Sequence, residues 1–575
     1  MQPEYDVIVV GAGPAGAACA LTLARKGANV LMVEKAKVPG ERNMTGGVLY
    51  GTAGGQYGMT DLVPDFETEA PVQRRIVSHE VSVISDPDWS DGTYRYYRMT
   101  NRSIASRLGL FKIGLESGHD YSVLRREFDQ WFAGRAVREG AMLSTQTTVE
   151  ELIREGDSVV GVRTTHEDLR AKLVVDASGV TSNLVEMAGL RARLEPDQLY
   201  QGLKHVYKID PKVIEERFKV GKGEGRALLF LGSFMLGVRG GAFIYTNQDT
   251  LSVGVVVSMD SMIKVYTEHF ERAGKTLDVL QSFETHPMIA ELLEGAEVVE
   301  YSAHNVPKGH KTMLKTPYSN GFLVAGDSLG SFVKIGPLLD GMRSAIATGI
   351  MAAQTYEYAD GLGSFTASAL SRYRDTLAPV YRNVARSGRD SRISESGFVY
   401  GTLPALLFAT IIPSRERKIK VDRRGDLKED ATQRVQMGTS LLSYYEDKVY
   451  SHIEVNLERG SASKVKPWIP SCPVNCYTLV TTKGVFASYK DLLDYNVAPM
   501  QQAYLAANGF EATSIELKAM QSAAMDATMN DIAEGQLRFD HVACVACGTC
   551  GQIGPKDIVA FHHERDGHGV RYRYG

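Results

Sequence analysis

The chain opens on a short apolar run, a glycine-rich turn, a long uncharged run and a second apolar run. In "DVIVVGAGPAGAACALTLARKGANVLMVEK", residues 7–10 are all β-branched, which is typical of a strand buried on both faces. A helical stretch follows the turn, and a second strand ends at Glu34. This strand–turn–helix–strand order predicts the start of a parallel sheet covered by helices.

The turn carries a GxGxxG pattern at Gly11, Gly13 and Gly16. The first glycine allows a tight turn, the second admits a pyrophosphate, and the third lets helix and strand lie close together. Glu34 follows 23 residues after Gly11, where a carboxylate can accept ribose hydroxyls, and Lys35 is adjacent. Strand, helix and acid in register predict dinucleotide binding at these five residues.

Two later strands end in polar residues. "KLVVDASGVTSNL" leads into Asp176 and Gly179, and "NGFLVAGDSLGSF" leads into Gly326 and Asp327. A second strand ending in Gly-Asp, some 300 residues after the first motif, suits the ribityl hydroxyls of a flavin. These residues therefore favour FAD over NAD.

Two predicted helices complete the flavin pattern. "YSVLRREFDQWFAGRAVREG" reads as a helix with Arg125 at its start, where a guanidinium can pair with pyrophosphate. "GPLLDGMRSAIATGIMAA" reads as a turn at Gly341 that opens a helix, whose N-terminus can stabilise negative charge on a reduced flavin. Together, in this order, the motifs predict a glutathione-reductase-like flavoprotein.

Alternation of apolar and polar residues marks the middle of the chain. "RALLFLGSFMLGVRGGAFIYTNQDTLSVGVVVSM" predicts an antiparallel sheet over the substrate side of the flavin. The sequence holds no second GxGxxG fingerprint. This argues against a dedicated NAD(P)H-binding domain.

Length, charge and hydropathy limit the number of domains and the classes of partner. The 575 residues predict two to four domains, and the net charge of −4 gives no basic field for nucleic acid. No secretory signal is evident. The apolar stretch 398–412 has 15 residues and is too short to span a bilayer, which needs about 20. It is either a buried helix pair or a monotopic membrane contact, helped by the basic flank after it.

Five of the six cysteines lie after residue 470, and three of them form CxxCxxC at Cys544, Cys547 and Cys550. This clustering predicts a metal or redox centre. The spacing favours an iron–sulfur cluster, and a zinc site is the alternative. His562, His563 and His568 are expected to be surface residues.

Several stretches resemble one family. "NMTGGVLYG", "RGGAFIYTNQDTLSVGVVV", "YSAHNVPKGHKTML" and "LVAGDS" are similar to FixC and electron-transfer-flavoprotein:quinone oxidoreductase (ETF-QO), and the tail resembles the ferredoxin-like FixX. The resemblance implies FAD, one [4Fe–4S] cluster, an electron transfer flavoprotein (an α/β heterodimer) as partner, and a membrane quinone, either ubiquinone or menaquinone. It also implies peripheral membrane association at the cytoplasmic face of the inner membrane.

The resemblance also assigns residues. Its "CPxxxY" motif matches Cys472 to Tyr477, so Cys472 would be the fourth cluster ligand, with Cys476 its competitor. Its quinone-contacting glycine pair matches Gly240 and Gly241. A bulge in a twisted sheet explains such a pair equally well. We assign no catalytic side chain, because electron transfer requires none beyond proton delivery to quinone.

We predict an α/β plus α+β fold with four parts. The FAD domain comprises 1–75, 105–195 and 300–360; the antiparallel-sheet quinone domain comprises 76–104 and 196–299; a helical segment covers 361–455; and a ferredoxin-like domain covers 456–575. An insert at about 480–540 reads as helical, with a capping box at Thr513 and Glu516. It is either a helical hairpin on the flavin domain or a docking surface.

Two other functions remain open. One is the quinone-reducing arm, a fused FixC–FixX, of an electron-bifurcating FixABCX-type complex that oxidises NADH. The other is a geranylgeranyl-reductase-like enzyme that saturates isoprenoid double bonds. The cysteine-rich tail argues against the second, because such a reductase does not need a ferredoxin module.

Overall fold

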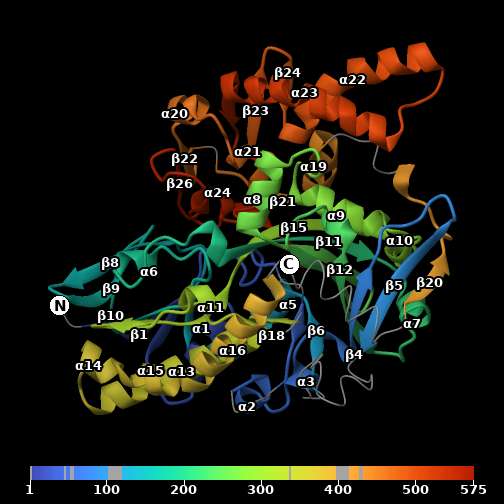
Figure 1. The fold of residues 1–575 in the computed structure, drawn as a ribbon. Helices are drawn as coiled ribbons and strands as arrows, with labels where there is room; N and C mark the ends of the chain where they lie inside the picture. Colours follow the sequence, from blue (N-terminus) through green and yellow to red (C-terminus); the bar gives the residue numbers. More distant parts are fainter. Residues whose placement is uncertain are drawn as a thin grey trace.

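The structure is a computed structural model that describes residues 3–44, 47–51, 57–100, 119–335, 338–395, 414–425, 431–447 and 449–575. Two large sheets lie side by side in the lower part of the molecule, and the C-terminal part sits above them (Figure 1). Residues 396–413, which include the apolar stretch 398–412, lie outside the described residues. Among those that are described, no helix is long and apolar enough to cross a membrane.

The first sheet is the predicted parallel one. Its strand order is β16 (Tyr318–Ser319), β17 (Phe322–Val324), β10 (Asp168–Asp176), β1 (Tyr5–Val10), β2 (Val30–Val33) and β7 (Met142–Ser144). Strand β9 (Ser158–Thr164) also pairs with β10, and β8 (Val149–Glu155) pairs with β9. The strands from β17 to β7 run parallel. Helix α1 (Pro14–Ala24) packs against both α5 (Arg125–Arg138) and α13 (Met342–Gly361).

The glycine turn explains how α1 can lie so close to the sheet. Gly11 has φ of +98°, and a Cβ on it would lie 2.6 Å from the Ala177 carbonyl oxygen. A Cβ on Gly16 would lie 1.9 Å from the Gly11 carbonyl oxygen. Only glycine therefore fits at either position.

The second sheet contains the predicted antiparallel strands and extends beyond them. Its order is β15 (Glu297–Pro307), β11 (Leu199–Lys208), β14 (Thr250–Ser258), β13 (Gly240–Thr246), β12 (Glu224–Gly232), β4 (Val72–Ile84), β5 (Thr93–Thr100) and β20 (Arg415–Lys418). Strands β3 (Val48–Leu49) and β6 (Tyr121–Val123) join it at β4, although we assigned both to the FAD domain. The alternating pattern predicted the central strands β12, β13 and β14. Strands such as β4 and β20 join the sheet by pairing with segments that are distant in the sequence.

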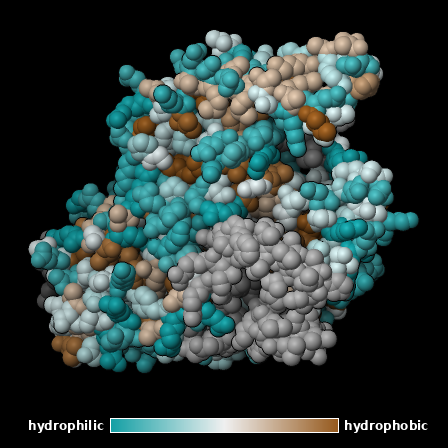
Figure 2. All heavy atoms as spheres, viewed as in Figure 1, coloured by the Kyte–Doolittle hydropathy of each residue, from teal (hydrophilic) through white to brown (hydrophobic). Residues whose placement is uncertain are grey.

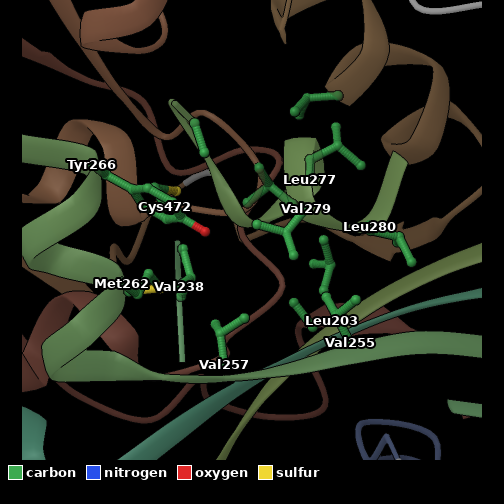
Figure 3. Close-up of a cluster of buried hydrophobic side chains, with 14 of the residues drawn as sticks. Leu203, Val238, Val255, Val257, Met262, Tyr266, Leu277, Val279, Leu280 and Cys472 are labelled. Atoms are coloured by element: carbon green, nitrogen blue, oxygen red, sulfur yellow. The ribbon is translucent and has the colours of Figure 1, made fainter. Parts of the chain in front are cut away.

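The two faces of this second sheet belong to different hydrophobic clusters. One face carries Leu203 and Val255 into a core shared with α8 (Met259–Glu268) and α9 (Thr276–Thr285). The other face carries Phe243 and Tyr245. Figure 3 shows Cys472 beside Tyr266 in the first of these cores, so the C-terminal part shares that core with the sheet.

The C-terminal part begins before residue 456. Strand β21 (Ser443–Tyr445) pairs with β27 (Gly569–Arg571), and β22 (Ile453–Val455) pairs with β26 (Val559–Phe561). A three-stranded sheet has the order β24 (Gly484–Phe486), β23 (Tyr477–Thr481) and β25 (Gln536–Phe539). Residues 443–455, which we assigned to the helical segment 361–455, therefore form strands of the C-terminal part.

The insert is a helical hairpin of α22 (Tyr489–Asn508) and α23 (Ser514–Glu534). The predicted capping box is confirmed: Thr513 accepts from the Glu516 N–H, and Glu516 accepts from the Thr513 N–H. The hairpin contacts β23, β24 and α8, and it points away from the first sheet (Figure 1). Figure 2 shows weakly hydrophobic residues, in tan, over this hairpin, where Phe510 and Ile515 are 56% and 79% exposed.

Candidate active site

A cavity of about 470 Å³ lies between the two sheets, within the usual range for small-molecule sites. It brings together all of the predicted cofactor residues except Gly16 and Asp176. Those lining it are Gly11, Gly13, Glu34, Lys35, Arg125, Gly179, Gly326, Asp327 and Gly341.

Glu34 ends strand β2 with its carboxylate turned toward the glycine loop. Its two oxygens accept hydrogen bonds of 2.9 Å from the N–H groups of Ala12 and Ala36. Each carboxylate oxygen can accept more than one bond, so Glu34 still has capacity for ribose hydroxyls.

Arg125 places a cation over the glycine loop from the first position of α5. Asp129, one helical turn later, accepts from its Nε at 2.9 Å and from its Nη2 at 2.7 Å. A Cβ on Gly13 would lie 3.5 Å from that Nη2. The guanidinium is thus fixed beside the backbone that would approach a pyrophosphate.

Asp327 offers the strongest test of whether a flavin fits. Its Oδ1 is buried with no hydrogen-bond partner among the described residues. Burial raises the pKa of Asp327 to about 6, although the Arg125 charge lowers it. A ribityl hydroxyl would supply the missing donor, so this side chain fits FAD.

Helix α13 points its N-terminus at the same cavity, where Gly341, Met342 and Ala345 line the wall. Asp340 accepts from the Arg343 Nε at 2.7 Å, and both side chains are buried. This pair braces the first turn, whose N–H groups and positive dipole end suit the electron-rich edge of a reduced flavin.

Asp176 and Gly16 act behind the cavity wall. Asp176 is fully buried and accepts from the Ser178 N–H at 3.0 Å and from the Ser182 hydroxyl at 2.6 Å. It therefore shapes the loop that carries Gly179. Gly16 lets α1 lie against the turn.

Gly240 and Gly241 also lie outside this cavity wall. They pair in regular register with Val257 and Val256 of β14. A Cβ on Gly240 would lie 2.1 Å from the Val256 carbonyl oxygen, and one on Gly241 would lie 3.1 Å from the Phe230 carbonyl oxygen. Close backbone packing thus explains both glycines, and a quinone at this pair stays a prediction.

Five cysteines gather around a second, small cavity of about 20 Å³. They are Cys472, Cys476, Cys544, Cys547 and Cys550. Backbone N–H groups of Cys476 and Ala546 point at the sulfurs of Cys472 and Cys544, each at 3.3 Å. Within the described part of the chain, no three His, Cys, Asp or Glu side chains converge as ligands of a single metal ion.

The donor chemistry of this second cavity fits an iron–sulfur cluster. Cysteine thiolates hold such clusters, and N–H groups aimed at the sulfurs tune their reduction potential. His452 Nε2 adds a contact of 3.2 Å to the Cys544 sulfur. Pro473, Val474, Val545 and Phe561 line the same space, so the thiols sit in mainly apolar surroundings.

The cysteines differ in their proton affinity. Burial raises the pKa of Cys472, but the Cys476 side chain and the Lys275 ammonium outweigh this and bring it to about 7. The Cys476 and His452 side chains hold the pKa of Cys544 well below its usual range. Contact with Cys472 and Cys544 raises the pKa of Cys476, whereas burial raises that of Cys547 to about 12.

The cysteine loop also reaches the large cavity. Ala546, between two of the cysteines, lines the large cavity. The Thr549 hydroxyl donates to the Asn305 side-chain oxygen at 2.8 Å, and Asn305 also lines the large cavity. The cysteine loop therefore contributes directly to the wall of the predicted flavin site.

Sequence reasoning missed a further part of the wall. His562 and His563, expected at the surface, line the large cavity together with Tyr450 and Arg565. All four belong to the C-terminal part. Their neighbours in sequence carry no cofactor motif. Their place in the cavity wall becomes visible only from the contact between the C-terminal part and the first sheet.

The comparisons with known proteins agree with this site. The family of FAD-dependent oxidoreductases matches residues 6–212, and the ubiquinone-binding region of ETF-QO matches residues 200–306. Protein FixC of Escherichia coli K12 is 36% identical over 374 residues, covering 65% of this chain and 81% of that protein. The probable electron transfer flavoprotein-quinone oxidoreductase YgcN of the same strain is 35% identical over 389 residues, covering 67% and 82%.

A solved structure shares the fold alone. A geranylgeranyl bacteriochlorophyll reductase-like protein from Thermoplasma acidophilum is 20% identical, has a TM-score of 0.51, and is matched over 68% of this chain and 87% of that one. The cavity, its motifs and these likenesses define an FAD-dependent oxidoreductase. The chain belongs to the FixC and ETF-QO family.

Proposed function

We propose that this protein oxidises an electron transfer flavoprotein and passes the electrons, by way of a [4Fe–4S] cluster and FAD, to a membrane quinone. When bound, FAD exchanges one or two electrons and a cluster exchanges one, so together they join one-electron and two-electron carriers. The observation that carries the proposal is that Ala546, between Cys544 and Cys547 in the sequence, lines the large cavity that holds the predicted flavin residues.

Cys472, Cys544, Cys547 and Cys550 would hold the cluster. Cys472 is favoured over Cys476 because it opens the CPxxxY match, and the Cys476 N–H points at its sulfur at 3.3 Å. A protonated Cys476 can donate a hydrogen bond to a ligating sulfur, which is a tuning role rather than a ligand's role.

The second sheet would bind the quinone, because residues 200–306 match the ubiquinone-binding region of the family. A quinone head group is carried on a lipid tail, so the protein would associate peripherally with the cytoplasmic face of the inner membrane. The likeness to FixC supports an alternative setting, the quinone arm of a bifurcating complex. Stable co-purification of NADH-oxidising partner subunits would favour that setting.

The first experiment is anaerobic purification with iron and zinc analysis and EPR of the reduced protein. We expect about four irons per FAD and a cluster signal that Cys472→Ser and Cys547→Ser abolish. Cys476→Ser should keep the signal with a changed potential. Cys19→Ala, in α1, is the matched control and should change neither. Zinc without iron, or loss of the signal in Cys476→Ser alone, would refute this ligand set.

The quinone assignment needs a test that does not rely on glycine variants, because a Cβ at Gly240 would clash with backbone whether or not quinone binds there. A photoreactive quinone analogue should label peptides within 200–306, and unlabelled quinone should suppress the labelling. Labelling confined to other peptides would remove the second sheet as the quinone site.

A further inference from the structure

The segment His562–Asp566 leaves strand β26 and reaches the first sheet. The Glu564 side chain is 3% exposed, and its oxygens lie 3.1 Å from the Lys35 Nζ and 3.2 Å from an Arg42 Nη. The Thr148 hydroxyl donates to the backbone oxygen of Glu564 at 2.8 Å. One buried carboxylate therefore pins this segment to two cations beside the glycine loop.

His563 stands next to this anchor with a defined tautomer. The Lys35 Nζ lies 3.2 Å from His563 Nδ1, and an ammonium can only donate, so Nδ1 accepts. Burial, aided by the Lys35 charge, lowers the pKa of His563 to about 3, which keeps the ring neutral. The ring proton is then on Nε2, the nitrogen that does not face Lys35, and His563 is one of the residues that line the cavity.

The lining residues indicate which half of FAD would fit at this end of the cavity. Glu34 and Lys35, at the end of β2, line the wall together with Thr147, Thr148 and Val149. A carboxylate at the end of the second strand marks the ribose of the AMP half, beyond the pyrophosphate at the N-terminus of α1. His562, His563 and Arg565 line the cavity from the C-terminal part, and Lys35 touches both sides.

We propose that residues 562–566 clamp the AMP half of FAD, with His563 donating its Nε2–H to an acceptor atom of the nucleotide and Glu564 holding the clamp in place. The cysteine-bearing part of the chain would then serve the flavin as a binding element as well as an electron carrier. This inference goes beyond the proposed function, because it requires only bound FAD and holds whatever the electron donor is.

The test compares nucleotide binding in His563→Phe and His563→Gln. Phenylalanine keeps the ring volume without a donor, whereas glutamine places an amide N–H near the position of Nε2. FAD release from the holoprotein, followed by flavin fluorescence, should be about 3- to 10-fold faster in His563→Phe, the range for one neutral hydrogen bond, and close to wild type in His563→Gln. ADP binding to the flavin-free protein should weaken by the same factor, and FMN binding should not change.

His568→Gln is the matched control. His568 lies in the same loop and stacks on Tyr445, but it does not line the cavity. It should release FAD at the wild-type rate. Iron content and thermal unfolding should be unchanged in all three variants, which separates a binding effect from a folding effect.

Hydrogen exchange gives a second readout that needs no variant. Adding ADP to the flavin-free protein should slow exchange in residues 562–566. The proposal is overturned if ADP gives no protection there, or if His563→Phe binds FAD and ADP as wild type does. A loss that is equal for FMN would also overturn it, since the clamp would then not be on the AMP half. Failure of the cluster or quinone experiments would leave it untouched.

Discussion

At the residue scale, an acid with a buried carboxylate oxygen that lacks a hydrogen-bond donor destabilises the folded state unless a ligand supplies the donor. Asp327 is such an acid: its Oδ1 lacks a donor among the described residues, and burial raises its pKa to about 6. In the flavin-free protein the folded state therefore holds the proton more tightly than the unfolded state does. This penalty is small below about pH 4, grows as the pH rises through 6, and is full above that.

Asp327→Asn should consequently have two opposite effects. In the flavin-free protein it should raise the free energy of unfolding by roughly 2 kcal/mol at pH 7.5 and change little near pH 4. It should also weaken FAD binding, because a carboxylate is the stronger acceptor for a ribityl hydroxyl.

Thermal unfolding at several pH values and FAD titration would measure both effects. Asp197→Asn, at a side chain that is 54% exposed, is the matched control. A variant that is stabilised equally at pH 4 and pH 7.5 would show that ionisation of Asp327 is not the cause.

The same scale shows what the sequence could predict. Glu34 and Arg125 were found because the strand, the turn and the first residue of a helix fix their positions locally. Asp176 and Asp327 look alike in sequence, each following an apolar run, although Asp176 ends β10 and Asp327 lies in the first turn of α12 (Gly326–Leu329). They differ because Ser178 and Ser182 turn toward Asp176 and satisfy it internally. Side-chain pairing within a loop leaves no periodic pattern to read.

At the element scale, a single buried lysine joins the α22–α23 hairpin to the rest of the C-terminal part. The Lys466 Nζ donates at 2.8 Å to the carbonyl oxygens of Ser463 and Ile532, and the residue is 0% exposed. Ile532 lies in the last turn of α23, where unpaired carbonyls and the negative end of the helix dipole favour a cation.

Lys466→Met should therefore loosen α23 while keeping the bulk of the side chain. The two carbonyls would lose a buried partner, at a cost of about 1–3 kcal/mol. Hydrogen exchange across residues 514–534 should become faster, with little change in the first sheet. Lys518→Met, at an exposed position of the same helix, is the control. Equal exchange in the two variants would contradict an anchoring role.

The insert also shows the limit of pattern reading for elements. The capping box at Thr513 was visible because it is a local signal. The sequence did not predict which face of the hairpin is buried. Apolar residues such as Ile515 are exposed, so the apolar positions of the helix do not form one continuous stripe. Likewise, β3 and β6 joined the second sheet through pairing with distant strands, which short apolar runs do not encode.

At the scale of the whole molecule, the cysteine-bearing part is built into the enzyme rather than attached to it. Its residues Cys472 and Tyr477 share one buried core with Leu203 and Val255 of the second sheet. Glu564 fixes the same part to Lys35 and Arg42 beside the flavin cavity. Breaking this arrangement would expose a shared core and leave buried charges without partners.

A single cooperative transition should follow from this shared construction. On heating, flavin release, loss of the cysteine-site absorbance and loss of secondary structure should occur within a few degrees of one another. A chain of independent modules would instead lose the proposed cluster and the flavin at clearly separate temperatures. Calorimetry with parallel visible spectroscopy distinguishes a single transition from separate ones. Glu564→Gln provides a second test of whether the two parts unfold together. By removing the charge that Lys35 and Arg42 share, this substitution should lower the temperature of flavin release and of cluster loss together, whereas a shift in only one of them would show that the two parts unfold independently.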